Sequence, residues 1–302
     1  LWAVNKSFDP KKPTLLLNSH HDTVLPNKAY TRDPFRAEIL DGKLYGLGSN
    51  DAGGALVSLL ACFNYFYENP NLKYNILMVA SAEEETAGDK SLRYLIPYLP
   101  KIDFAIIGEP TQMELAIAEK GLVVFDIEIK GTPSHAAHPN KDNPLMKLPE
   151  IIKKIENISF EKVSPILGPV KLTLTQINAG SQHNVVPSEV KLVLDVRVNE
   201  CYQNHEIDEV IQKALPCNVK ARSLHLKSSS ISIDHPIVKA GEKLGRKTYG
   251  SPTLSDQASL SCPSLKLGPG DSTRSHSSDE FIYIKEIEEG ISIYINLLKQ
   301  II

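Results

Sequence analysis

Several short segments of the sequence end an apolar run in side chains that could bind a metal ion or move a proton. They supply His20, Asp51, the run Glu83–Glu85, Glu109 and His276, with no cysteine among them. Imidazole and carboxylate ligands without thiolate suit a catalytic zinc or a similar divalent ion better than a structural zinc. Five ligands with one bridging carboxylate are about what a two-metal hydrolytic site requires. The pattern therefore indicates metal-assisted hydrolysis.

The first of these segments, "LLLNSHHDTVLP", begins as a buried strand and ends in His20, His21 and Asp22. Side chains alternate across a strand, so we expect His20 and Asp22 on one side and His21 on the other. A histidine that binds a metal usually donates its second N–H to a carboxylate, and Asp22 is placed to orient His20 in this way. A polar strand end that is merely solvated is the alternative.

The other segments also have simpler explanations. Asp51 follows a glycine-rich turn and precedes a helix, where a helix N-cap would account for it. The adjacent carboxylates of Glu83–Glu85 repel one another unless solvent or a cation relieves them, and two of them could give one ligand and one general base. Glu109 and His276 each follow a strand. Their shared position at strand ends favours a common site.

The elements that would position these residues are those of an α/β domain. Short apolar strands alternate with helical stretches, which predicts an α/β domain with a largely parallel sheet flanked by helices. An Asp41-Gly42 hairpin turn and a final helix with one apolar stripe belong to the same domain. The expected strands are "TLLLNS", "YNILMVAS" and "FAIIGEP", the expected helices are 52–67 and 91–98, and the stripe is Ile287, Ile291, Tyr294, Leu298 and Ile301.

A second kind of sheet begins near Gly121, where strands alternate strictly between apolar and polar residues, as in "EVKLVLDVRV". We predict a ferredoxin-like β-α-β-β-α-β unit at 119–228, inserted into a catalytic domain formed by 1–118 and 229–302. Val190, Leu192, Leu194, Val196 and Val198 should share one face. The predicted strands are 122–130, 169–178, 188–199 and 218–226, and the predicted helices are 145–158 and 205–215.

Composition favours a small-molecule partner. The 302 residues carry a net charge of −3, without the basic excess that nucleic acid or an anionic membrane would require. The four cysteines form no C-x-x-C pair and no long apolar span is visible, so we expect a cytoplasmic protein. Because the chain starts at Leu1 without a methionine, we also expect that the natural N-terminus is missing.

The motifs, taken in order, resemble the M20 metallopeptidases and deacylases over essentially the whole chain. "YTRDPFRAEILDGKLYGLGSNDAGG" and "GPGDSTRSHSSDEF" look most like the acetylornithine deacetylase group. The resemblance implies two divalent ions, zinc in the first place, with cobalt or manganese as alternatives. It implies His20 and Glu109 as ligands of one ion, Glu85 and His276 as ligands of the other, Asp51 as the bridge, Glu84 as the general base and Asp22 as the orienter of His20.

The resemblance also implies a zinc-peptidase-like mixed sheet flanked by helices for the catalytic domain. It implies that the ferredoxin-like insertion is a lid and dimerisation domain, and hence that the protein is a homodimer. "GTPSHAAHP" implies His135 as a residue that stabilises the oxyanion, often from the partner subunit. "GSQHNVVP" and "LDVRV" imply Asn184 and Arg197 as binders of the substrate's carboxylate. We interpret His138 and His183 as polar loop residues without a role.

The implied reaction is hydrolysis of the amide bond of an N-acyl amino acid, as in acetylornithine deacetylase of arginine biosynthesis. The alternatives are deacylation of acetyl- or succinyl-citrulline or ornithine, desuccinylation of succinyl-diaminopimelate, and peptide hydrolysis. Leu47 and Ala52-Gly53-Gly54 depart from many relatives, which affects the substrate more than the chemistry. Arg274 could contact substrate, although an exposed loop arginine is the simpler interpretation.

Three other classes of function compete with this one. A serine hydrolase could use Ser272 or Ser275 beside His276, but the sequence has no Gly-x-Ser-x-Gly elbow. A zinc aminopeptidase of the same core architecture would lack the insertion. A non-catalytic protein on this fold would be expected to have lost a ligand or Glu84, and all are present.

Overall fold

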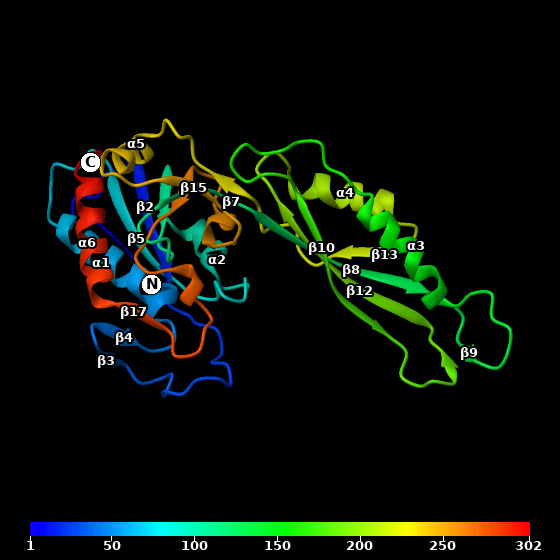
Figure 1. The fold of residues 1–302 in the computed structure, drawn as a ribbon. Coiled ribbons are helices and arrows are strands. Elements are labelled where there is room, and N and C mark those ends of the chain that lie inside the picture. Colours follow the sequence, from blue (N-terminus) through cyan, green and yellow to red (C-terminus); the bar gives the residue numbers. More distant parts are fainter. The chain divides into compact units, whose positions relative to one another are not determined.

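The structure is a computed structural model that describes residues 1–302, and it divides into two compact units (Figure 1). Unit 1 comprises Leu1–Ala118, Ser229–Ser251 and Ser255–Ile302. Unit 2 comprises Glu119–Ser228 and Pro252–Leu254. Two long stretches of chain that flank unit 2 in the sequence therefore fold together as unit 1.

The centre of unit 1 is an eight-stranded sheet in the order β1-β5-β2-β6-β16-β7-β14, with β15 paired to β7. Four neighbouring strands are parallel, so their carboxyl ends meet at one edge. The sheet is mixed, because β1 and β7 pair antiparallel with their neighbours. The parallel strands are β5 (Asn75–Ser81), β2 (Thr14–His20), β6 (Phe104–Ile107) and β16 (Ser264–Lys266); the others are β1 (Trp2–Val4), β7 (Leu115–Glu119), β14 (Ser229–Ser230) and β15 (Thr248–Ser251).

Helices cover both faces of this sheet because its central strands are apolar on both sides. Leu15 and Leu17 of β2 belong to a core with residues of α1 (Gly54–Phe66), α5 (Pro236–Lys243) and α6 (Ile284–Leu298). Leu16 belongs to a smaller core with Leu92 of α2 (Leu92–Leu95), which continues into η2 (Ile96–Tyr98). On the final helix Tyr294 and Leu298 are buried as predicted, and so is Ile301 just beyond its end, whereas Ile287 and Ile291 are only half-buried.

The predicted hairpin is confirmed. Its strands β3 (Glu38–Leu40) and β4 (Lys43–Tyr45) flank Asp41 and Gly42, whose φ angles are 51° and 74°, as a type I′ turn requires. A third strand, β17 (Phe281–Tyr283), pairs with β4. Three short turns, η1 (Ser49–Gly53), η3 (Asp256–Ser259) and η4 (Ser272–Arg274), complete unit 1.

Unit 2 is a four-stranded antiparallel sheet in the order β10-β12-β8-β13, packed on one face against two helices (Figure 1). The five alternating residues from Val190 to Val198 lie on one face of β12. All of them are buried in the core between the sheet and the helices, as their spacing predicts. A two-stranded ladder, β9 with β11, stands apart from this sheet. The elements are β8 (Gly121–Lys130), β9 (Ser134–His135), α3 (Pro144–Glu156), β10 (Lys171–Ala179), β11 (Val185–Val186), β12 (Glu189–Val198), α4 (Asn204–Ala214) and β13 (Asn218–Ala221).

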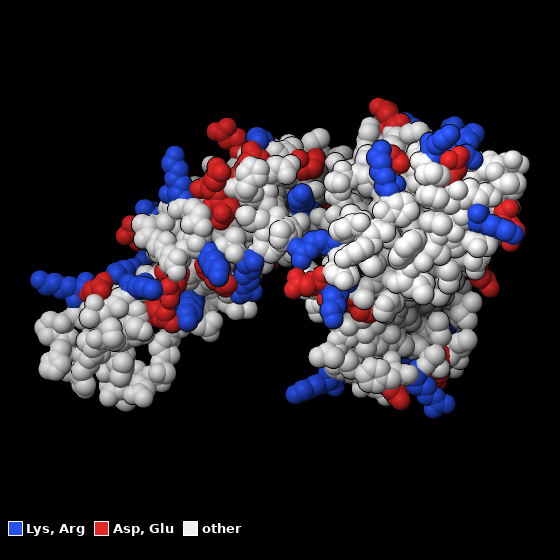
Figure 2. Space-filling model, turned by 180° about the vertical axis from the view of Figure 1, so that it is seen from behind, with Lys and Arg blue, Asp and Glu red and all other residues white.

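None of the helices combines the length and the apolar character that crossing a bilayer requires. On the face shown in Figure 2, lysine and arginine are interspersed with aspartate and glutamate.

Candidate metal centre

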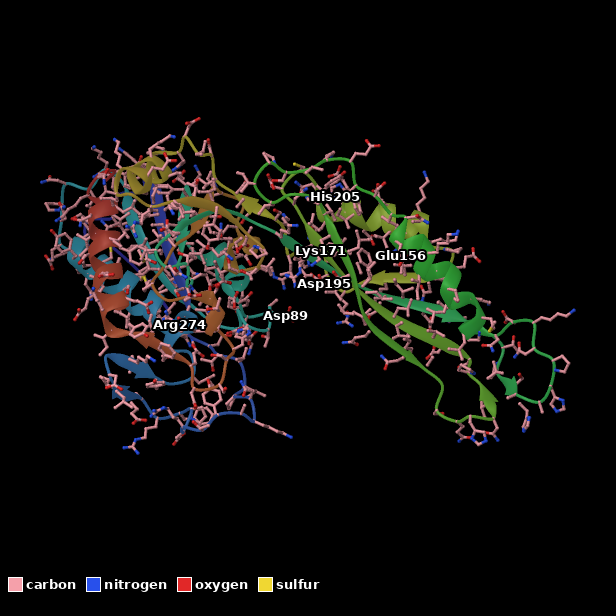
Figure 3. The ribbon with its side chains drawn as sticks, in the orientation of Figure 1. Asp89, Glu156, Lys171, Asp195, His205 and Arg274 are labelled. Atoms are coloured by element: carbon pink, nitrogen blue, oxygen red, sulfur yellow. The ribbon has the colours of Figure 1, made fainter.

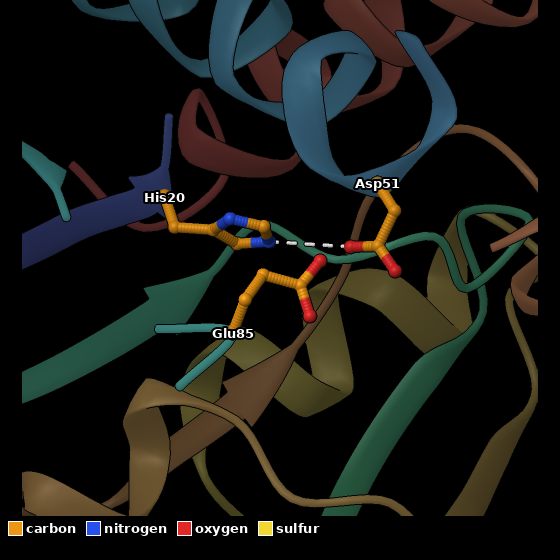
Figure 4. Close-up of side chains that lie close together, drawn as sticks. All are labelled: His20, Asp51 and Glu85. Carbon is orange, nitrogen blue, oxygen red and sulfur yellow. Dashed lines mark hydrogen bonds and ion pairs between the residues drawn. The ribbon is translucent and has the colours of Figure 1, made fainter. Parts of the chain in front are cut away.

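His20 is the last residue of β2, and its imidazole is buried at the carboxyl edge of the sheet, with 1% of its side chain exposed. Its Nε2 lies 3.2 Å from Oδ1 of Asp51, the contact drawn in Figure 4. Its Nδ1 lies 2.9 Å from the main-chain oxygen of Asp22. Both ring nitrogens are therefore directed at oxygen atoms, and the ring has one defined orientation.

Asp22 orients His20 differently from the sequence prediction. The Asp22 carboxylate lies 3.6 Å from His20 Nδ1, farther than its main-chain oxygen, and accepts hydrogen bonds from the amides of Glu84 and Glu85 at 3.3 and 3.2 Å. β2 ends at His20, so strand alternation does not extend to Asp22. The residue therefore joins two segments of the centre, through its carbonyl and its carboxylate.

Asp51 lies in the turn η1 at the start of α1, between two histidines. Its Oδ1 faces His20, while its Oδ2 lies 3.6 Å from Nε2 of His276. The same Nε2 of His276 lies 3.0 Å from Oε2 of Glu85. A carboxylate that presents one oxygen to each of two histidines has the arrangement of a ligand that bridges two ions, which is the role predicted for Asp51.

The remaining predicted residues lie around this core. Ligand atoms of His20, Asp51 and Glu85 all lie within 4.8 Å of one another (Figure 4). Glu84 Oε2 is 4.0 Å from His20 Nε2. Glu109 follows β6 and interacts electrostatically with His20, Asp51 and Glu84, although no ion pair within 4.0 Å joins it to them.

The electrostatics of the cluster fit a cation. Burial and the neighbouring carboxylates raise the pKa of Glu84 to about 8, and raise those of Glu85 and Glu109 above their usual range. Burial disfavours the imidazolium of His20, but the carboxylates of Asp51, Glu109 and Glu84 outweigh it and raise its pKa to about 11. Crowded buried carboxylates of this kind are stabilised by divalent ions, which prefer imidazole and carboxylate ligands. The donor set therefore fits a divalent metal centre.

A buried glutamate that the sequence did not reveal holds the Asp51 turn. Glu280 is 2% exposed, and its carboxylate accepts hydrogen bonds from the amides of Asn50 and Asp51, both at 2.9 Å, and of Gly48, at 3.1 Å. It is more than 200 residues from its partners, and a single glutamate in "HSSDEF" has no pattern that points to this role. Glu280 fixes the backbone from which Asp51 projects.

Glu280→Ala is expected to destabilise unit 1 by about 3 kcal/mol, because it leaves three N–H donors without an acceptor, one buried at Asn50 and two partly buried at Gly48 and Asp51. It should also weaken divalent-ion binding by loosening the Asp51 turn. Denaturant unfolding of the metal-free protein and calorimetric ion titration measure the two effects. Glu280→Gln retains one carbonyl oxygen and should lose less stability and less ion affinity than Glu280→Ala. Equal losses in the two variants would count against Glu280 as the acceptor that holds the Asp51 turn.

The predicted substrate residues lie in unit 2, and they are not all at one end of it. His135 of β9 pairs with Val185 of β11, and the amide of Ala136 donates to the carbonyl of Asn184 at 2.9 Å, so His135 and Asn184 are neighbours. Arg197 lies eight residues along β12 from Glu189, which is about 26 Å in an extended strand. One subunit therefore does not bring Arg197 next to Asn184.

Both arginines that were considered for substrate contact have partners. Arg197 donates two hydrogen bonds to Asp195, at 2.9 and 3.2 Å. Arg274 is not the exposed loop residue that the sequence indicated: 19% of its side chain is exposed, it donates to both carboxylate oxygens of Glu286 at 2.7 and 2.9 Å, and it lies over the ring of Phe281. Figure 3 labels Arg274 and Asp195 in their separate units. Arg274 therefore connects η4 to the last helix.

Comparison with known proteins agrees with this geometry. Residues 16–300 match the sequence model described as peptidase family M20/M25/M40. The chain belongs to this family. An M20 member is a metal-dependent hydrolase, and amide hydrolysis is the chemistry of its named relatives.

Two curated relatives are named succinyl-diaminopimelate desuccinylase. That of Rickettsia felis is 27% identical over 333 aligned residues, covering 100% of this chain and 86% of the relative. That of Rickettsia canadensis is 31% identical over 228 residues, covering 70% of this chain and 58% of the relative. The M20 resemblance seen in the motifs is thus confirmed at the level of the family.

Solved structures of M20 proteins share the fold. An M20 family metallo-carboxypeptidase from Sulfolobus solfataricus superposes with a TM-score of 0.78 at 16% identity, covering 99% of this chain and 87% of that one. The YXEP protein of Bacillus subtilis, described as a dinuclear metal-binding peptidase from the M20 family, gives a TM-score of 0.70 at 16% identity, covering 99% and 84%.

Proposed function

We propose that the protein is a dinuclear metal-dependent deacylase that hydrolyses the amide bond of an N-succinyl amino acid, with succinyl-diaminopimelate as the first candidate. The main support for two-metal hydrolysis is the position of Asp51, which directs one carboxylate oxygen toward His20 and the other toward His276. The desuccinylase names of the relatives support the choice of substrate, and with it a place in lysine biosynthesis. Nothing in these names supports the first expectation, acetylornithine deacetylase of arginine biosynthesis.

The proposed ligands form two ion sites that share Asp51. His20, Asp51 and Glu109 would hold one divalent ion, and Asp51, Glu85 and His276 the other. When bound, such ions polarise the amide carbonyl and lower the pKa of water. Zinc fits these ligands, as do cobalt and manganese.

Glu84 supplies the proton transfers. Its carboxylate takes a proton from the attacking water and returns it to the nitrogen of the leaving amine as the C–N bond breaks. The products are a carboxylate and a free amine. Asp22 holds the amides of Glu84 and Glu85 and thereby sets where the base stands relative to the ligands.

A deacylation screen tests the substrate assignment. Metal-supplemented protein is incubated with succinyl-diaminopimelate, succinyl-ornithine, succinyl-citrulline, acetylornithine and acetylcitrulline, and free amine is measured. We expect the succinyl substrates to be cleaved with higher kcat/KM than the acetyl ones. Preference for acetylornithine would overturn the succinyl assignment, and cleavage of di- or tripeptides alone would identify a peptidase.

We further propose a homodimer in which His135 and Asn184 act on the site of the partner subunit. The support is the distance along β12: His135 and Asn184 lie beyond the end of β12 that begins at Glu189, and Arg197 is about 26 Å along the strand from Glu189, farther than one small substrate extends. Two subunits arranged with two-fold symmetry can bring opposite ends of this unit to the same site.

Mixing inactive variants tests this arrangement. Glu84→Gln protein and His135→Ala protein, allowed to exchange subunits, are expected to recover about a quarter of wild-type activity, because half of the dimers gain one intact site. Glu84→Gln mixed with Arg197→Ala is the matched control and should recover none. If the first mixture stays inactive after exchange has been shown by a tag, His135 does not act in trans.

A further inference from the structure

A buried carboxylate outside the predicted ligand set binds the two strands that lead into the candidate metal centre. Asp256 begins η3, between β15 and β16, and is 4% exposed. Its Oδ2 accepts two hydrogen bonds, from Nδ2 of Asn18 at 2.9 Å and from Oγ of Ser81 at 2.6 Å. Asn18 and Ser81 are themselves at most 1% exposed. No motif in the sequence singles out Asp256.

The two partners of Asp256 lie on the two strands that lead into the centre. Asn18 is on β2, two residues before His20, and Ser81 is the last residue of β5, three residues before Glu84. The strands are parallel neighbours, with His20 in register with Ser81. One oxygen of Asp256 therefore ties the strand that supplies a ligand to the strand that supplies the base.

This connection is buried throughout. Because Asn18, Ser81 and Asp256 are all buried, a donor that lost Asp256 would remain without an acceptor, which is costly. Oδ1 of Asn18 has no hydrogen-bond partner, so the Asn18 amide is fixed through its donor side by Asp256. The main-chain oxygen of Ser81 accepts from the amide of His21 at 3.0 Å, which continues the pairing of the two segments past the strand ends.

We propose that Asp256 is a positioning residue that sets the spacing between His20 on β2 and Glu84–Glu85 after β5. This inference rests on the proposed function, since it assigns roles to those residues. Asp256 makes no hydrogen bond to a proposed ligand or to the base, although its charge interacts with those of Glu84 and His20, and it positions them through Asn18 and Ser81. A displacement of about 1 Å in a catalytic constellation can cost about 100-fold in rate, so a small loss of register between the strands should be measurable.

Three variants separate positioning from general stability. Asp256→Ala removes both hydrogen bonds, Asp256→Asn keeps one side-chain oxygen, and Ser81→Ala removes only the hydrogen bond to β5. Ser164→Ala is the matched control, because it breaks the hydrogen bond of a buried serine to a carboxylate in unit 2, from Ser164 to Glu200 at 2.5 Å. If Asp256→Ala does not fold, Ser81→Ala still tests the proposal, because it removes one of the two hydrogen bonds to Asp256.

The experiment combines a readout on metal-free protein with two on the metal-loaded enzyme. Hydrogen exchange of amides in residues 76–88 should be faster in metal-free Asp256→Ala and Ser81→Ala than in wild type, and unchanged in Ser164→Ala. In the loaded enzyme Asp256→Ala should lower kcat about 100-fold with KM little changed, and alter the absorption spectrum of bound Co²⁺. Asp256→Asn should recover most of the rate.

The inference is overturned if Asp256→Ala keeps wild-type exchange in residues 76–88, or if its kcat and Co²⁺ spectrum match those of Ser164→Ala. Such a result would leave the proposed function intact, because wild-type activity is measured in the same series. If wild-type protein binds no divalent ion and cleaves no amide, the proposed function fails, whereas the exchange comparison still decides whether Asp256 joins the two strands.

Discussion

Glu84→Gln is expected to lower kcat by about 10²–10⁴-fold while divalent ions still bind, because the amide has nearly the shape of the carboxylate but cannot accept the proton of water. Glu84 lies beside the proposed ligands, with Oε2 4.0 Å from Nε2 of His20, and is held by its amide to the carboxylate of Asp22. Steady-state kinetics and calorimetric ion titration on the same preparation measure both quantities.

Glu83→Gln is the matched control for this prediction. Glu83 precedes Glu84, but its carboxylate accepts a hydrogen bond from the amide of Lys90 at 2.9 Å, away from the proposed ligands. We expect near-normal turnover from this variant. Normal turnover in Glu84→Gln, with Glu83→Gln impaired, would show that the base had been assigned to the wrong glutamate.

Removal of divalent ions is expected to abolish activity and lower the Tm. Each ion that binds only the folded chain stabilises it by about 2.7 kcal/mol at a free concentration 100 times its Kd. The gain comes from compensating the burial and the mutual repulsion that raise the pKa values of Glu84, Glu85 and Glu109. Thermal unfolding with chelator, and then with added Zn²⁺, Co²⁺ or Mn²⁺, measures the change.

Asp51→Ala is the control for the thermal experiment. Because Asp51 presents one oxygen to each histidine, its loss should remove most of the ion-dependent rise in Tm. A rise of wild-type size in Asp51→Ala would mean that the stabilising ions bind elsewhere on the chain.

Local patterns predicted the elements well. The strict alternation from Val190 to Val198 gave the buried face of β12, and the Asp41-Gly42 pair gave the hairpin turn. In both cases the signal lies within a few residues, where side-chain period or backbone preference decides the outcome. β13 ends at Ala221, whereas the sequence predicted an end at 226. This boundary was harder to predict, because it depends on where the pairing between β13 and β8 stops.

The centre was predictable only in part, for a physical reason. His20, Asp51 and Glu85 each follow or precede a recognisable element, and the carboxyl edge of a parallel sheet brings such positions together. The supporting carboxylates Glu280 and Asp256 hold the turn and the strand ends through contacts 175 to 238 residues away in the sequence. No local period encodes such contacts.

Two residues show how tertiary contacts change an interpretation made from the sequence. Asp22 was expected to orient His20 by its carboxylate, but the strand ends first and the main-chain oxygen is closer. Arg274 was interpreted as an exposed loop residue, but Glu286 of the last helix accepts both of its hydrogen bonds. In each case the partner could not be identified without the folded backbone.

Anomalous X-ray diffraction from zinc-soaked crystals tests the dinuclear centre most directly. We predict two peaks per chain, one among His20, Asp51 and Glu109 and one among Asp51, Glu85 and His276, with Asp51 in contact with both. A single peak, or peaks away from Asp51, would contradict the assignment of Asp51 as the bridging ligand and with it the proposed two-metal deacylase.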